Sequence, residues 1–236
     1  MNPLALIAIM FFANFTQSVA GFGAALVAVP LLTEPLGAQN TAAMIPLTAV
    51  VTQTVLLLRY RSALDLRMVG RLSAAAVVAI PIGVLVLTRV DEQATRTVLG
   101  LLVIAYALYA LLNLRLPELR SPRWAYGFGF AGGLLSGAYN IPGPVVVIYG
   151  SCKRWPSDVF RSNLQGFFML NNLTVMAAHA LARHYTPFVF QTFVVALPGV
   201  ALGLAAGILL DRFIDPALFR RIVLLLLIAL GVNLIL

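Results

Sequence analysis

Two long apolar runs, each broken near its middle, constrain this sequence more than any other feature. The first run covers residues 4–32 and is interrupted at Gly21, Phe22 and Gly23. The second run follows 119 residues later and is interrupted around Asn140 and Pro142. Interrupted apolar segments at corresponding places of two halves are typical of the binding site of a secondary transporter.

The composition predicts an all-α polytopic membrane protein. Of the 236 residues, 61% are hydrophobic and 10% are charged, and the mean hydropathy is +0.96. The polar stretches between apolar runs are too short to fold alone, so we expect one membrane domain over residues 1–236. The net charge of +8 comes from lysines and arginines in the loops, which we interpret as setting the orientation of the helices in the membrane and not as a site for nucleic acid. Cys152 is the only cysteine, and we expect no metal site and no cofactor.

Apolar runs between charged borders predict eight segments, four in each half. Matches between the halves at spacings of 119 and 124 residues favour an internal duplication, with repeats at 1–118 and 119–236. The predicted segments lie near residues 4–32, 40–58, 68–88, 95–114, 124–150, 162–182, 188–210 and 217–236.

The 16 lysines and arginines distinguish two topologies. If all eight segments crossed a membrane, each face would carry eight basic residues, against the positive-inside rule. If the runs 4–32 and 124–150 each enter and return to the same face, only Arg89, Arg96 and Arg183 lie on one face and the other 13 basic residues lie opposite. The second topology is therefore favoured, with the basic face in the cytoplasm.

This topology gives each half a re-entrant or broken helical hairpin and three transmembrane helices. Because three is an odd number of crossings, the second half begins on the opposite face of the membrane from the first. The two halves are therefore expected to be inverted repeats, with both termini outside. Gly21, Gly23, Pro142 and Pro144 suit irregular backbone at the two breaks. The alternative is a kinked helix that crosses completely, because glycine and proline are common in membrane helices.

The polar residues within the apolar runs are neutral, and they gather around the breaks. Every carboxylate lies in a loop or at a segment edge, which disfavours coupling through an embedded acid. Amide, hydroxyl and helix N-terminal groups can donate hydrogen bonds to a small anion. The alternative for each polar residue taken singly is a hydrogen bond between helices. Thr48 and His179 are read as such helix contacts. The candidate binding residues of this kind are Asn14, Gln17, Ser18, Thr52, Gln53, Ser136, Tyr139, Asn140, Gln165, Asn171 and Asn172.

Two short motifs resemble the sulfite exporter TauE/SafE family of membrane permeases. The first is residues 20–24, Ala-Gly-Phe-Gly-Ala, followed by Val-Pro-Leu at 29–31. The second is Gly-Leu-Leu-Ser-Gly at 133–137, leading into Ile-Pro-Gly-Pro at 141–144. The resemblance implies a multi-pass permease of the bacterial inner membrane for sulfite, sulfonates or organic acids. It also implies a substrate path at Gly21, Phe22, Gly23, Asn140, Pro142 and Gly143.

The leading hypothesis is a secondary permease that exports a small anion, in contact with the lipid bilayer and assembled as a homo-oligomer. A monovalent anion leaving a negative interior gains roughly 2.3 kcal/mol per 100 mV, so export needs no coupling ion. The alternative is a membrane subunit that binds an anion or a partner without transport. An enzyme is not expected, because His179 and His184 are the only histidines and have no carboxylate nearby in the sequence.

Overall fold

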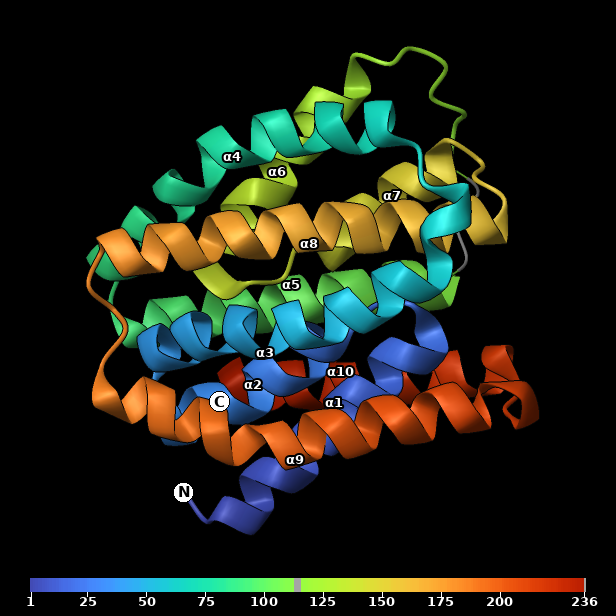
Figure 1. Ribbon diagram of the computed structural model, residues 1–236. Helices are drawn as coiled ribbons and strands as arrows, with labels where there is room; N and C mark the ends of the chain where they lie inside the picture. The colour runs from blue at the N-terminus through green and yellow to red at the C-terminus, as the bar shows by residue number, and fades with distance from the viewer. Residues whose placement is uncertain (113–115, 236) are drawn as a thin grey trace.

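The two broken runs each form a pair of helices. The computed structural model describes residues 1–112 and 116–235, and these form helices without a strand (Figure 1). The predicted ends of segments 95–114 and 217–236, and Arg115, lie outside the described residues. The helices are α1 (Pro3–Ala20), α2 (Ala24–Leu36), α3 (Ala38–Tyr60), α4 (Leu66–Arg89), α5 (Glu92–Leu112), α6 (Trp124–Tyr139), α7 (Gly143–Cys152), α8 (Ser157–Leu181), α9 (Pro187–Leu210) and α10 (Pro216–Ile235), with short 3₁₀ turns η1 (Arg61–Ala63) and η2 (Asp211–Phe213).

Six described helices are long and apolar enough to cross a membrane: α1, α3, α4, α5, α9 and α10. The sequence also predicted six crossing helices, but two of the assignments differ: α1 is long enough to cross, and α8 is not among the six. Helix α1 was expected to be part of a hairpin that does not cross, yet its 18 residues extend about 27 Å, close to the hydrocarbon thickness of a bilayer. Helix α8 was expected to cross, and it has the length, but amide, charged and histidine side chains make it less apolar.

The chain reverses at both breaks, as the hairpin interpretation predicts. In the first half, Leu36 at the end of α2 lines the same surface hollow as Met1 and Pro3. In the second half, the backbone N–H of Leu119, which precedes α6, donates to the carbonyl of Cys152 at the end of α7, at 3.0 Å. Each broken run therefore returns to the end of the bundle from which it came, and neither continues as a kinked helix.

Glycines allow two pairs of parallel helices to approach backbone to backbone. A Cβ on Gly133 of α6 would lie 2.7 Å from the Cα of Ala76 in α4, and a Cβ on Gly199 of α9 would lie 3.1 Å from the Cα of Ile7 in α1. Glycines recur at four-residue intervals along both contacts, at 129, 133 and 137 in α6 and at 199, 203 and 207 in α9. Small residues at this spacing are the usual means of close packing between membrane helices.

The helix pairing repeats when the two halves are exchanged. The first helix of each half, α1 or α6, packs on the fourth helix of the other half, α9 or α4. The last helices, α5 and α10, pack antiparallel, since Gly100 contacts Ile235 while Ile104 contacts Gly231. Two halves related by a two-fold axis would pair in this way. Their inverted orientation across a membrane stays a prediction.

One end of the bundle gathers the basic loops, and we call it the basic end. The Lys153 ammonium donates to the carbonyl oxygens of Leu119 and Arg120, at 2.9 and 3.3 Å. The Arg161 guanidinium donates to the Tyr60 hydroxyl and lies 3.6 Å from an Asp211 carboxylate oxygen. These contacts join the loops before α4, α6, α8 and α10, which carry most of the lysines and arginines.

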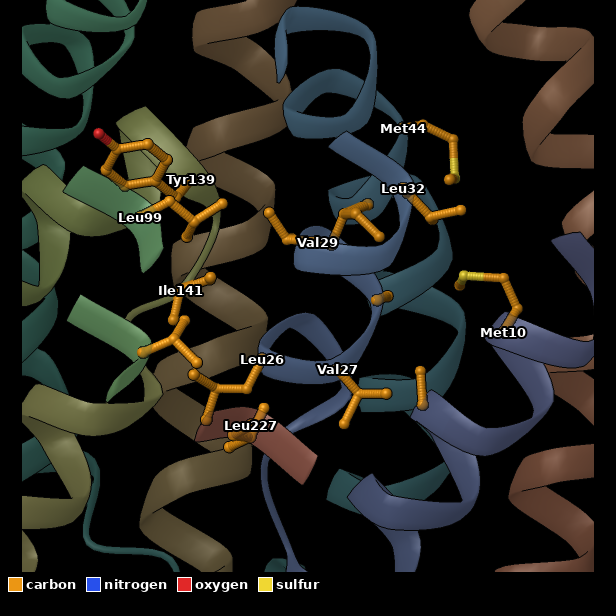
Figure 2. Packing of buried hydrophobic residues seen from close by; sticks show 14 of the residues in the cluster. Met10, Leu26, Val27, Val29, Leu32, Met44, Leu99, Tyr139, Ile141 and Leu227 are labelled. Atoms are coloured by element: carbon orange, nitrogen blue, oxygen red, sulfur yellow. The ribbon is translucent and has the colours of Figure 1, made fainter. Parts of the chain in front are cut away.

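Helix α2 lies between the second break and helix α1 in the apolar core. Figure 2 shows Val27 and Val29 of α2 with Ile141 and Tyr139 on one side and Met10 of α1 on the other. Leu26 and Ile141 also line one small apolar hollow, together with Leu99 of α5. The two breaks are thus held side by side by apolar packing.

Candidate functional site

The first break is a left-handed turn that Gln17 bridges. Gly21 and Gly23 have φ angles of 81° and 111°, which glycine adopts without steric cost. The N–H of Gly21 donates to the carbonyl of Gln17, closing α1, at 2.8 Å. The side-chain Oε1 of Gln17 accepts the N–H of Ala24, the first residue of α2, at 3.0 Å. Gln17 therefore ends one helix and starts the next.

The second break is a left-handed turn at Asn140. Its φ and ψ are 54° and 34°, a conformation that asparagine tolerates better than most residues. The N–H groups of Asn140 and Ile141 close α6 by donating to the carbonyls of Ser136 and Leu135. Pro142 and Pro144 then start α7, where a missing N–H costs little.

A cavity of about 50 Å³ lies between the two breaks. This volume corresponds to space for a few water molecules or one small anion. None of the described residues that line it is charged. The lining residues are Met10, Asn14, Gln17, Gly23, Ala24, Ala25, Leu26, Ala28, Ile45, Thr48, Ala49, Gln53, Asn140, Ile141, Pro142, Gly143, Phe168 and Asn172.

Three amides at the cavity have polar atoms without a hydrogen-bond partner among the described residues. These atoms are Nε2 of Gln17, Oε1 of Gln53 and Oδ1 of Asn140, and all three side chains are at least 96% buried. The orientation of the Gln17 amide is fixed, because its Oε1 is occupied by the N–H of Ala24. Its –NH₂ group is therefore a buried donor in need of an acceptor.

The N-termini of α2 and α7 both reach the cavity. Gly23, Ala24 and Ala25 line it at the start of α2, and Gly143 lines it at the start of α7. The first N–H groups of a helix have no acceptor within the helix, and the N-terminus carries a partial positive charge. The two helix N-termini thus place partial positive charge at a cavity whose described lining contains no lysine or arginine.

Half of the predicted binding residues line the cavity. They are Asn14, Gln17, Gly23, Gln53, Asn140, Pro142, Gly143 and Asn172.

Three further predicted residues support the cavity from behind. Thr52 donates to Oδ1 of Asn14 at 2.5 Å, and Ser18 donates to the Asn14 carbonyl. Gln165 donates through Nε2 to the carbonyl of Gly21 at 2.7 Å. These contacts hold α1 in register with α3 and α8.

The remaining predicted residues lie away from the cavity. Phe22 packs edge-on against Tyr106, and Tyr139 lines the neighbouring apolar hollow. Ser136 bonds within α6, and Gly21 faces Arg161. Asn171 is buried, with neither side-chain polar atom bonded to a described residue.

Sequence reasoning missed most of the apolar lining of the cavity. Met10, Ile45 and Phe168 were not singled out, and Thr48 was interpreted only as a contact between helices. Their spacing carried a signal, since Met10 lies four residues before Asn14 and Phe168 four residues before Asn172. Residues four apart lie on the same helix face.

The two histidines form a separate pair at the end of α8. The Nδ1 atoms of His179 and His184 are 2.8 Å apart, so one ring donates and the other accepts. Burial lowers the pKa of His184, which lies in the loop before α9. Neither residue lines the cavity.

The fold and cavity define the chain as a polytopic helical membrane protein with a small neutral cavity at two helix breaks. It belongs to the family described as Sulfite exporter TauE/SafE, whose family model matches residues 6–234. This membership makes the chain a membrane permease, from a family of anion transporters and not of enzymes. No curated protein and no solved structure gave a match to the chain.

Proposed function

We propose that this chain is a secondary permease that exports a small anion, such as sulfite, a sulfonate or an organic acid, across the bacterial inner membrane. The observation that carries the proposal is the cavity between the two breaks, where Gln17 presents a buried unpaired donor. The basic end faces the cytoplasm under the positive-inside rule.

The chemistry of the cavity favours an anion. Gln17 supplies a donor, and so do the N–H groups of Ala25 and Leu26, which follow Ala24 in the first turn of α2; the two helix N-termini supply partial positive charge. The absence of an arginine or lysine among the described lining residues keeps binding weak enough for release. Asn14, Gln53, Asn140 and Asn172 complete a polar wall without charge. The Asn14 –NH₂ group is occupied by the carbonyl of Met10, and the unpaired atoms of Gln53 and Asn140 are the oxygens Oε1 and Oδ1, which can accept from a protonated oxyanion or from water bound with it.

Transport occurs when one hairpin and its partner helices rock against the other hairpin. The contacts α1 with α9 and α6 with α4 each join a hairpin to a helix of the opposite half, so two rigid bodies of this kind are available. The substrate remains between the breaks while access changes from the basic end to the opposite end. Export of a monovalent anion is driven by the membrane potential, at roughly 2.3 kcal/mol per 100 mV.

Reconstituted protein tests this function through efflux of radiolabelled sulfite from proteoliposomes with an imposed potential. We expect efflux that saturates with sulfite concentration and accelerates when the sulfite compartment is made negative, since charge moves with the anion. A taurine arm and an acetate arm compare a sulfonate and a carboxylate. A rate of sulfite efflux that does not change with the membrane potential would contradict electrogenic export. Sulfite binding without any flux would favour a non-transporting subunit.

A further inference from the structure

Arg161 is the charged residue that packs against the first break. It lies in the second turn of α8, and its Cγ is the closest atom to a Cβ built on Gly21, at 3.6 Å. Its side chain is 31% exposed, so the guanidinium reaches solvent at the basic end while its stem packs on the break.

The guanidinium of Arg161 has free hydrogen-bonding capacity. Its Nη1 donates to the Tyr60 hydroxyl at 3.2 Å, and the guanidinium lies 5.6 Å from the centre of the Tyr60 ring. The Asp211 carboxylate is 3.6 Å away, which is an ion pair but too long for a hydrogen bond. A guanidinium has five N–H donors in a planar fork, a geometry that matches an oxyanion. An anion of suitable shape thus competes with Asp211 for Arg161.

One face of α8 connects Arg161 to the cavity. Gln165 follows four residues later and bonds the carbonyl of Gly21. Phe168 and Asn172 follow at seven and eleven residues from Arg161, and both line the cavity. Residues at these intervals lie on one helix face. The face therefore extends from a cation at the basic end, past an amide at the break, to the amide wall of the cavity.

The residues around Arg161 come from both halves of the chain. Tyr60 ends α3 and Gly21 belongs to the first hairpin, whereas Arg161 and Asp211 belong to α8 and η2. Arg161 thus connects the two halves through Tyr60, whereas its ion pair with Asp211 lies within the second half.

We propose that Arg161 is the entry site for the transported anion at the basic end, where the anion takes the place of the Asp211 carboxylate. The proposal rests on the permease function above. An incoming anion pairs with Arg161, releases Asp211, and then moves along the shared face of α8, past Gln165, toward the cavity.

The chain offers a matched control at the same end. Arg154 pairs with Glu118 at 3.9 Å, and their side chains are 72% and 44% exposed. This ion pair lies away from the described cavity lining and has the same chemistry. Exposed pairs contribute little to stability, so Arg154→Gln and Glu118→Gln preserve the fold.

The experiment measures sulfite flux in oriented vesicles with sulfite added at the basic end, and sulfite-induced thermal stabilisation of the purified protein. Loss of a hydrogen bond to a charged group weakens binding about 10-fold or more, so we expect Arg161→Gln to raise the KM at least that much. Asp211→Asn removes the competing carboxylate, and we expect the KM to fall about 3-fold. Arg161→Lys keeps the positive charge but loses the planar guanidinium, so we expect a KM between those of wild type and Arg161→Gln. The Arg154 and Glu118 variants should match wild type.

The two proposals fail in different ways. Wild-type flux with an unchanged KM in Arg161→Gln would overturn the entry site and leave the permease intact. Sulfite stabilisation that requires Arg161, in a protein without flux, would overturn the permease and with it the entry role, and would leave Arg161 as an anion-binding residue only. A protein with neither sulfite flux nor sulfite stabilisation would overturn both. If Asp211→Asn raised the KM instead of lowering it, the exchange of carboxylate for anion would be wrong.

Discussion

Leucine in place of Gly137 is expected to leave very little folded protein. A Cβ at this position would overlap the carbonyl oxygen of Ile80 and lie 2.8 Å from the backbone N of Val84. Both atoms belong to the α4 backbone, which has no flexible side chain to move aside, so α4 and α6 must separate along their length. We expect a loss of about 3 kcal/mol or more in stability, measured as a lower melting temperature and a loss of monodisperse protein in detergent.

The control for this substitution is Gly127→Leu in the same helix. A Cβ on Gly127 meets nothing within 4 Å, so leucine there should leave the melting temperature unchanged. Equal effects at positions 127 and 137 would show that helix propensity, and not the close contact of α4 with α6, determines the result.

Glutamate in place of Gln17 is expected to abolish transport while preserving the fold. The carboxylate still accepts the N–H of Ala24, but it replaces the free –NH₂ donor at the cavity with negative charge. Lost hydrogen bonding to an anion, with added repulsion, should reduce sulfite flux about 100-fold. Because burial raises a carboxyl pKa, flux is best compared at pH 8, where more of the glutamate is ionised.

Gln191→Glu provides the matched control for position 17. Gln191 is an exposed glutamine on α9 that does not line the cavity. The same change of charge there should leave flux at the wild-type rate. Full activity of Gln17→Glu, with a normal melting temperature in both variants, would remove Gln17 from the binding site.

The architecture followed from the sequence because breaks and charges are local signals. Glycines at 21 and 23 and prolines at 142 and 144 marked the two reversals, and both reversals are present. The asymmetric distribution of lysine and arginine predicted that the loops near Tyr60, Arg120, Lys153 and Asp211 share one end, and their contacts place them together.

The depth of the first hairpin could not be predicted from the sequence. The sequence predicts that the run 4–32 enters and returns to the same face, but a return of this kind can occur at any depth. Helix α1 has 18 residues and carries Gly21 to Arg161 at the basic end. Along this length it packs against α9 at Gly199 and Gly203, which lie some 190 residues away in the sequence.

The division of roles among the predicted site residues also depends on tertiary packing. Thr52 and Gln53 are neighbours in the sequence, yet Gln53 lines the cavity and Thr52 bonds Asn14 behind it. Likewise Asn172 lines the cavity, whereas Asn171 is buried elsewhere. Successive side chains of a helix point about 100° apart around its axis, so two adjacent residues cannot both face the cavity. Only the packing of α3 and α8 decides which of the two faces it.

Equilibrium binding of radiolabelled sulfite tests the central claim, that the anion lies in the cavity between the two breaks. The comparison uses purified wild type, Ala49→Leu, which fills the cavity wall, and Ala74→Leu, which adds the same bulk to an exposed position on α4. We predict one saturable site per chain in wild type and in Ala74→Leu, and no saturable binding in Ala49→Leu at an unchanged melting temperature. Undiminished binding by Ala49→Leu would place the anion elsewhere and contradict the account.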